Sequence, residues 1–125
     1  MDVEKQLKYW REGAREALRS VPVLEEGEFW AEALFWTHLA VEKALKAHVV
    51  KSTRETPPYV HNLVRLGEIA GLDLSSVQIR LCDSLNRYQR LARYPYQSVC
   101  EPDSDTSRRL LSEAREFLEW LLTRL

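Results

Sequence analysis

The stretch DSLNRYQRLARYPYQ carries side chains suited to binding phosphate groups and nucleobases. Four of its residues fall at positions i, i+4, i+7 and i+11 and would share one face of a helix: Asp83, Arg87, Arg90 and Tyr94. A guanidinium group can hold phosphate oxygens with two hydrogen bonds, and a tyrosine ring can stack on a base. The alternative is an ordinary solvated face with an Asp83–Arg87 ion pair and arginines that bury only their aliphatic stems.

A second stretch, HLAVEKALKAHVV, places charged residues within an apolar helix. Glu42 and Lys46 stand four residues apart, in the order that favours an ion pair worth about 0.2–0.5 kcal/mol. We expect Glu42, Lys43 and Lys46 to form a solvated face, with a binding site as the alternative. His38 lies on or beside the apolar stripe and is expected to be a hydrogen-bonded core histidine. Neither His38 nor His48 has a partner at zinc-type spacing, so no metal site is predicted.

A third stretch, YVHNL, follows the proline pair Pro57-Pro58. His61 and Asn62 are placed to cap the next helix or to anchor the loop, and they are equally suited to a role in a binding site. The sequence leaves both interpretations open.

These residues must be positioned by helices, because apolar residues recur with helical spacing along most of the chain. Proline, glycine and capping residues separate the helical segments. The expected helices are Val3–Arg19, Glu28–Lys51, Val60–Ala70, Leu74 or Ser75 to Arg93, and a last helix to Leu125 that an Asp or Ser of EPDSDTS caps. Gly71 is expected to terminate the third of them, and Tyr94, which precedes Pro95, to mark an end or a kink.

The second of these helices is apolar on two opposite sides, which predicts that it lies at the centre of a bundle or at a dimer seam. Large side chains line one side, and alanines line the other: Ala33, Ala40, Ala44 and Ala47. The last helix also has a wide apolar stripe, which fits either self-association or the core of one chain.

Composition limits the classes of protein that need consideration. The 125 residues fit one domain, 1–125, and 45% hydrophobic with 30% charged residues is typical of a globular chain. A net charge of −1 argues against nucleic-acid binding through the overall field and leaves only local contacts. Cys82 and Cys100 form no CxxC motif, and neither a signal peptide nor a membrane span is expected. These features favour a cytoplasmic protein.

In the order FWTHLAVEKALKAHVV, PPYVHNLVRL and NRYQRLARYPY, the three stretches resemble the HEPN domain family. The matching positions are Ala40, Glu42, Lys43, Leu45, Lys46 and Ala47 in the central helix, His61, Asn62 and Leu63 in the second element, and Arg93, Tyr94 and Pro95 in the third. The resemblance implies an all-α, up-and-down bundle of four to five helices that forms a homodimer. It also implies a nucleotidyltransferase partner, as in toxin-antitoxin pairs, and in some members metal-independent ribonuclease activity or nucleotide binding.

The sequence departs from the ribonuclease members of that family at one point. In those members a histidine follows an arginine by four to six residues, and here no histidine follows Arg87, Arg90 or Arg93 at that spacing. Without that imidazole the usual proton carrier is absent, and the catalytic residues are unknown, with Arg90, Arg93 and His61 as candidates. Tyr94 or Tyr96 is a candidate acceptor for a nucleotide attached by the partner.

The sequence therefore predicts a protein that binds nucleotide or RNA phosphates together with a nucleotidyltransferase partner. The predicted contacts are Arg87, Arg90, Arg93 and Tyr94, with Lys43, Lys46 and His61 beside them. No cofactor is expected other than a bound nucleotide. The alternatives are a metal-independent ribonuclease that lacks the usual histidine and a non-catalytic protein-interaction module.

Overall fold

A computed structural model of the protein describes residues 1–89 and 102–125. These residues form six helices and no strand, which confirms the predicted all-α bundle. The helices are α1 (Val3–Leu18), α2 (Val21–Glu26), α3 (Trp30–Thr53), α4 (Leu63–Ile69), α5 (Ser76–Asn86) and α6 (Ser104–Thr123). Within this part of the chain, no helix combines the length and the apolar character needed to cross a membrane.

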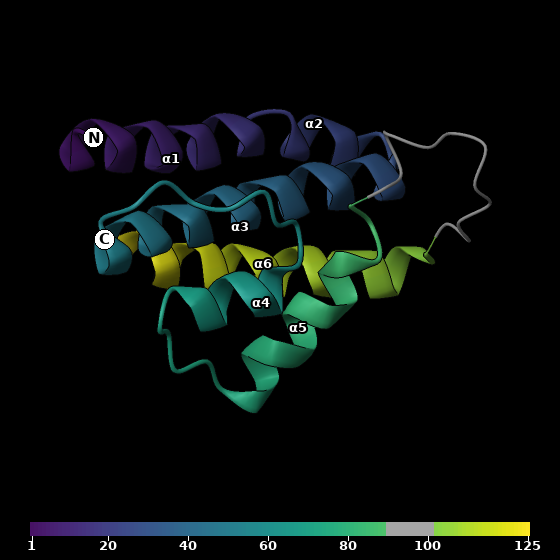
Figure 1. Ribbon diagram of the computed structural model, residues 1–125. Coiled ribbons are helices and arrows are strands. Elements are labelled where there is room, and N and C mark those ends of the chain that lie inside the picture. The colour runs from purple at the N-terminus through teal and green to yellow at the C-terminus, as the bar shows by residue number, and fades with distance from the viewer. Residues whose placement is uncertain (90–101) are drawn as a thin grey trace.

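Helix α3 lies at the centre of the bundle. It contacts each of the five other helices, and Figure 1 shows α1 and α2 along one side of it, with α4 and α5 on the opposite side. The alanines of its second apolar side have no exposed surface, which confirms that the helix is buried on two sides: Ala33, Ala40, Ala44 and Ala47. All six helices contribute to one apolar core.

Helix α6 packs its wide apolar stripe against this core. Leu111, Ala114 and Leu121 have no exposed surface, and Leu122 is half-buried against the core. A single chain therefore buries most of this stripe, and its width needs no second copy to explain it.

Local capping residues set several helix ends where the sequence places them. Asp103 caps α6 by accepting a hydrogen bond from the backbone N–H of Thr106 at 2.7 Å. Gly71 follows α4 with φ +71°, a left-handed conformation that glycine adopts without a steric penalty. The predicted caps are thus confirmed at both positions.

Other boundaries differ from those expected. The segment around Pro22, predicted as an interruption, forms the short helix α2, because proline in the first turn of a helix loses no hydrogen bond. Helix α4 begins at Leu63 and not at Val60, since Asn62 is its N-cap.

Helix α5 ends at Asn86, before the expected end at Arg93. Turn conformation follows in residues 87–89, and Arg93 itself lies outside the described residues.

Candidate functional site

Six polar side chains meet where α3, the start of α4 and the end of α5 come together. We call this group the polar junction: His38, Glu42, Lys46, His61, Asn62 and Asn86. It brings the central-helix motif and the YVHNL motif into direct contact, although 19 residues separate Glu42 from His61.

Glu42 contacts two basic side chains, those of His61 and Lys46. One carboxylate oxygen, Oε1, accepts a hydrogen bond from His61 Nδ1 at 2.9 Å, and the other, Oε2, lies 3.4 Å from Lys46 Nζ. The Glu42 side chain is only 5% exposed, whereas that of His61 is 40% exposed. A buried carboxylate therefore orients a partly exposed imidazole.

The predicted Glu42–Lys46 ion pair is present, but the prediction that these residues form a solvated face was wrong. Both residues are buried, Lys46 beneath a side chain of α1 and Glu42 beside His61. Lys46 Nζ lies 5.3 Å from the centroid of the Trp10 ring of α1, in a cation–π contact. The periodicity of α3 alone could not show that a side chain of another helix covers Lys46.

Asn86 holds the end of α5 to the two other elements. Its Oδ1 accepts hydrogen bonds from the backbone N–H of Leu63 at 3.0 Å and from His38 Nε2 at 3.3 Å. Its Nδ2 donates to Asn62 Oδ1 at 3.1 Å, and that oxygen also accepts from the backbone N–H groups of Val64 and Arg65. Sequence analysis missed Asn86, whose only signal was a polar residue beside the apolar face of a helix.

His38 is a hydrogen-bonded core histidine, as predicted. Burial lowers its pKa, and this effect outweighs the opposing influence of Glu42 and of its hydrogen bonds to Asn86 and to the backbone of His61. A neutral ring has a single N–H, and Nε2 faces the Asn86 oxygen, so the ring donates to Asn86. His38 therefore holds the end of α5, while Glu42 orients the ring of His61.

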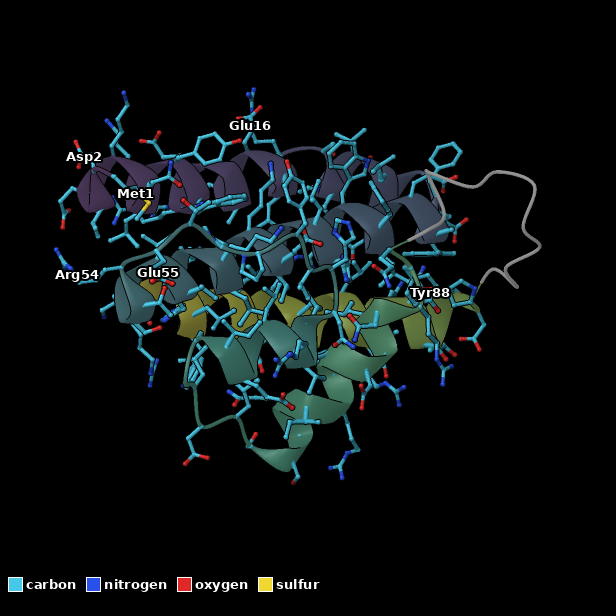
Figure 2. The ribbon with its side chains drawn as sticks, in the orientation of Figure 1. Met1, Asp2, Glu16, Arg54, Glu55 and Tyr88 are labelled. Atoms are coloured by element: carbon cyan, nitrogen blue, oxygen red, sulfur yellow. The ribbon has the colours of Figure 1, made fainter. Side chains whose placement is uncertain are left out.

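Arg87 directly follows the polar junction. Its side chain is exposed, and it stands between Asn86, which is tied to α3 and α4, and Tyr88, which is only 7% exposed. Figure 2 shows Tyr88 close to the beginning of α6. Burial raises the pKa of Tyr88, so this side chain stays neutral within the core. Among the described residues no ion pair forms between Asp83 and Arg87, which was the alternative interpretation of this face.

The other predicted site residues are not all brought together. Lys43 lies along α1, against Gly13. Arg90, Arg93, Tyr94 and Tyr96 lie outside the described residues, and their roles stay predictions.

The described parts of the chain offer neither a cluster of metal ligands nor a reactive thiol. In residues 1–89 and 102–125, no three His, Cys, Asp or Glu side chains gather closely enough to hold a metal ion. Burial raises the pKa of Cys82 to about 12, which keeps this thiol protonated and unreactive.

Comparison with known proteins provides a family and a fold. The family model of the HEPN domain matches residues 7–125. The crystal structure of TT1696 from Thermus thermophilus is similar, with a TM-score of 0.76, 23% sequence identity, and coverage of 96% of this chain and 98% of that one. At this identity the likeness shows the fold alone. No curated protein sequence matches the chain significantly.

Proposed function

The chain belongs to the HEPN domain family, and from this premise we propose that it binds the phosphate groups of a nucleotide or of RNA. In this proposal it acts as a cytoplasmic homodimer with a nucleotidyltransferase as its partner protein, in the manner of a toxin-antitoxin pair. His61 of the polar junction and the arginine segment that begins at Arg87 form the proposed binding surface.

The observation that carries the proposal is the fixed position of Arg87. An exposed arginine between two anchored neighbours has a restrained backbone, so less conformational freedom is lost when its guanidinium group binds an anion. Asn86, next to Arg87, is hydrogen-bonded to Asn62, next to His61. The Asn86–Asn62 hydrogen bond thus holds the backbone at Arg87 close to the backbone at His61.

The buried charges of the junction support the surface without touching the ligand. Lys46 is 8% exposed and paired with Glu42, so it serves to orient Glu42 and is removed from the proposed ligand contacts. Arg90, Arg93 and Tyr94 continue the proposed surface in sequence. Tyr94 or Tyr96 remains the proposed acceptor for a nucleotide that the partner attaches.

Metal-independent RNA cleavage is a second candidate function, and the His61–Glu42 hydrogen bond favours it. A carboxylate that accepts from one ring nitrogen sets the orientation of an imidazole, as it does in hydrolases that use histidine as a general base. This candidate requires cleavage without a metal ion.

The test compares native protein with Arg87→Ala, Arg90→Ala and Arg93→Ala, using a labelled single-stranded RNA in EDTA over a range of salt concentrations. Arg80→Ala is the matched control, because Arg80 is an exposed arginine earlier on α5. We expect the three variants to bind RNA more weakly and each to lower the salt-dependence slope by about 1, while the control binds like native protein.

Each outcome of this experiment decides between the candidates. Unchanged RNA binding in all three arginine variants would overturn the proposal. If the variants also form a complex with the partner protein as tightly as native protein does, the interaction module is favoured. RNA cleavage by native protein in EDTA that the variants lose would establish the second candidate instead.

A further inference from the structure

A cleft between α1 and α3 offers about 380 Å³ of space at the outer side of the bundle. Its walls come from the end of α1, the turn between α1 and α2, and α3: Glu16, Ala17, Arg19, Ser20, Trp36 and Lys43. Figure 2 shows Glu16, one of these residues, on the side of α1 that faces away from α4 and α5. We propose that this cleft binds one nucleotide, with the base on Trp36 and the phosphate on Lys43. The inference goes beyond the proposed function, because it places a nucleotide outside the polar junction and the segment that begins at Arg87.

Trp36 supplies the apolar surface of the cleft. It is 39% exposed, although it belongs to a helix whose other large apolar residues are mostly buried. Its described ring contact is with Phe35, edge to face at 5.5 Å, and this contact holds the indole against the helix. An exposed indole held in this way offers a stacking surface for any base.

Lys43 supplies the positive charge. It has no ion pair or hydrogen bond among the described residues, unlike Lys46, which is paired with Glu42. Its aliphatic stem crosses α1 at Gly13, where an added Cβ would lie 3.1 Å from Lys43 Cδ. A glycine inside a helix lowers helix stability, and here its missing side chain leaves room for Lys43 at one end of the cleft.

The spacing of the two residues fits one nucleotide. Trp36 and Lys43 are seven residues apart on α3, which places them on the same face and about 10 Å apart along the helix axis. The lysine side chain is flexible and covers part of that distance, so one ligand can reach both residues. The volume is also within the range of pockets that bind small molecules.

The remaining charges of the cleft nearly cancel. Arg19 Nη1 lies 3.1 Å from Glu16 Oε1 and 3.3 Å from Glu16 Oε2, so the guanidinium group offsets the carboxylate at the rim. Lys43 is therefore the uncompensated charge, and it selects an anion. An aromatic surface and one cation together favour a nucleotide over a free sugar phosphate or a free nucleoside.

The experiment measures binding of adenosine 5′-monophosphate, adenosine and ribose 5-phosphate by calorimetry. Native protein is expected to bind the monophosphate most tightly. Lys43→Met should make the affinity for the monophosphate equal to that for adenosine. Trp36→Leu should make the affinity for the monophosphate equal to that for ribose 5-phosphate, and loss of the stacking contact should lower the affinity by about 5- to 100-fold. Trp36→Phe keeps an aromatic ring and should retain most of the affinity.

Trp120→Leu and Lys5→Met are the matched controls, because they remove a tryptophan from α6 and an exposed lysine from α1 outside this cleft. Thermal melts establish that each variant is folded, and Trp36→Met, which also removes the aromatic ring, replaces Trp36→Leu if the latter is not. No binding of the monophosphate by native protein, or native-like binding by Lys43→Met and by the non-aromatic Trp36 variant, overturns the inference. The Arg87 variant tests the proposed function separately, since loss of RNA binding there can occur with an inert cleft.

Discussion

Replacement of Glu42 by glutamine tests whether the polar junction is held together by a buried charge. The substitution keeps the size of the side chain and removes its negative charge. The Lys46 side chain, which is 8% exposed, then has a buried ammonium group without a carboxylate beside it. His61 also loses the carboxylate that accepts its Nδ1 hydrogen.

The magnitude follows from the burial of both partners. Removal of one partner from a buried ion pair costs about 3–5 kcal/mol, because the other charge stays desolvated. The lower end applies here, since the Trp10 ring and the new amide oxygen still contact Lys46. We therefore expect the free energy of unfolding to fall by about 3 kcal/mol, which corresponds to a melting temperature lower by about 10 °C in a chain of this length.

The assay is urea unfolding followed by circular dichroism, with two companion variants. Glu16→Gln breaks the Glu16–Arg19 ion pair, whose side chains are 70% and 76% exposed, and it should cost less than about 0.5 kcal/mol. The double variant Glu42→Gln/Lys46→Met removes both charges and should recover part of the loss. If Glu42→Gln costs no more than Glu16→Gln, Lys46 is solvated and the account of the junction is refuted.

Three further predictions concern other buried groups. Asn86→Ala leaves the backbone N–H of Leu63 without its acceptor and should lower the free energy of unfolding by about 1–3 kcal/mol in the same urea assay. Burial lowers the pKa of His48, whose ring lies 2.7 Å from the carbonyl oxygen of Leu121. The unfolded chain therefore binds more protons than the folded one below about pH 6.5, and the melting temperature should fall on acidification, with a smaller fall in His48→Gln. In a Cys100→Ser variant, Cys82 should react with a thiol reagent at pH 8 only when urea unfolds the chain, and rapid labelling of the folded protein would contradict its burial.

The features predicted correctly from the sequence depend on residues close together in the chain. Asp103 accepts from the backbone N–H of Thr106, three residues later, so its role as a cap follows from local spacing. Asn62 caps α4 in the same way, a role that the sequence had left open beside one in a binding site. Gly71 ends α4 for an equally local reason. The burial of α3 on two sides was predictable because apolar residues on opposite faces of one helix have to be covered.

The features that sequence reasoning missed depend on contacts between distant segments. The burial of Lys46 involves α1, which supplies Trp10 from 36 positions before it, and Glu42 is contacted by His61, 19 positions after it. The role of Asn86 requires His38, 48 residues away in the chain. In both cases the local pattern was compatible with a solvated residue, and only the packing of helices decided otherwise.

The polar junction changes how substitutions in the HEPN-like motifs should be interpreted. Glu42 of the central helix is hydrogen-bonded to Lys46 and to His61, and Asn86 is hydrogen-bonded to His38 and to Asn62, the residue after His61. Substitutions at the buried members remove stability and can abolish binding by unfolding the junction.

Arg87 is different, because its side chain is exposed and has no ion pair among the described residues. Loss of binding in Arg87→Ala, with an unchanged melting temperature, therefore reports on ligand contact. The same loss in Glu42→Gln reports first on the fold, and the two variants together separate positioning from recognition.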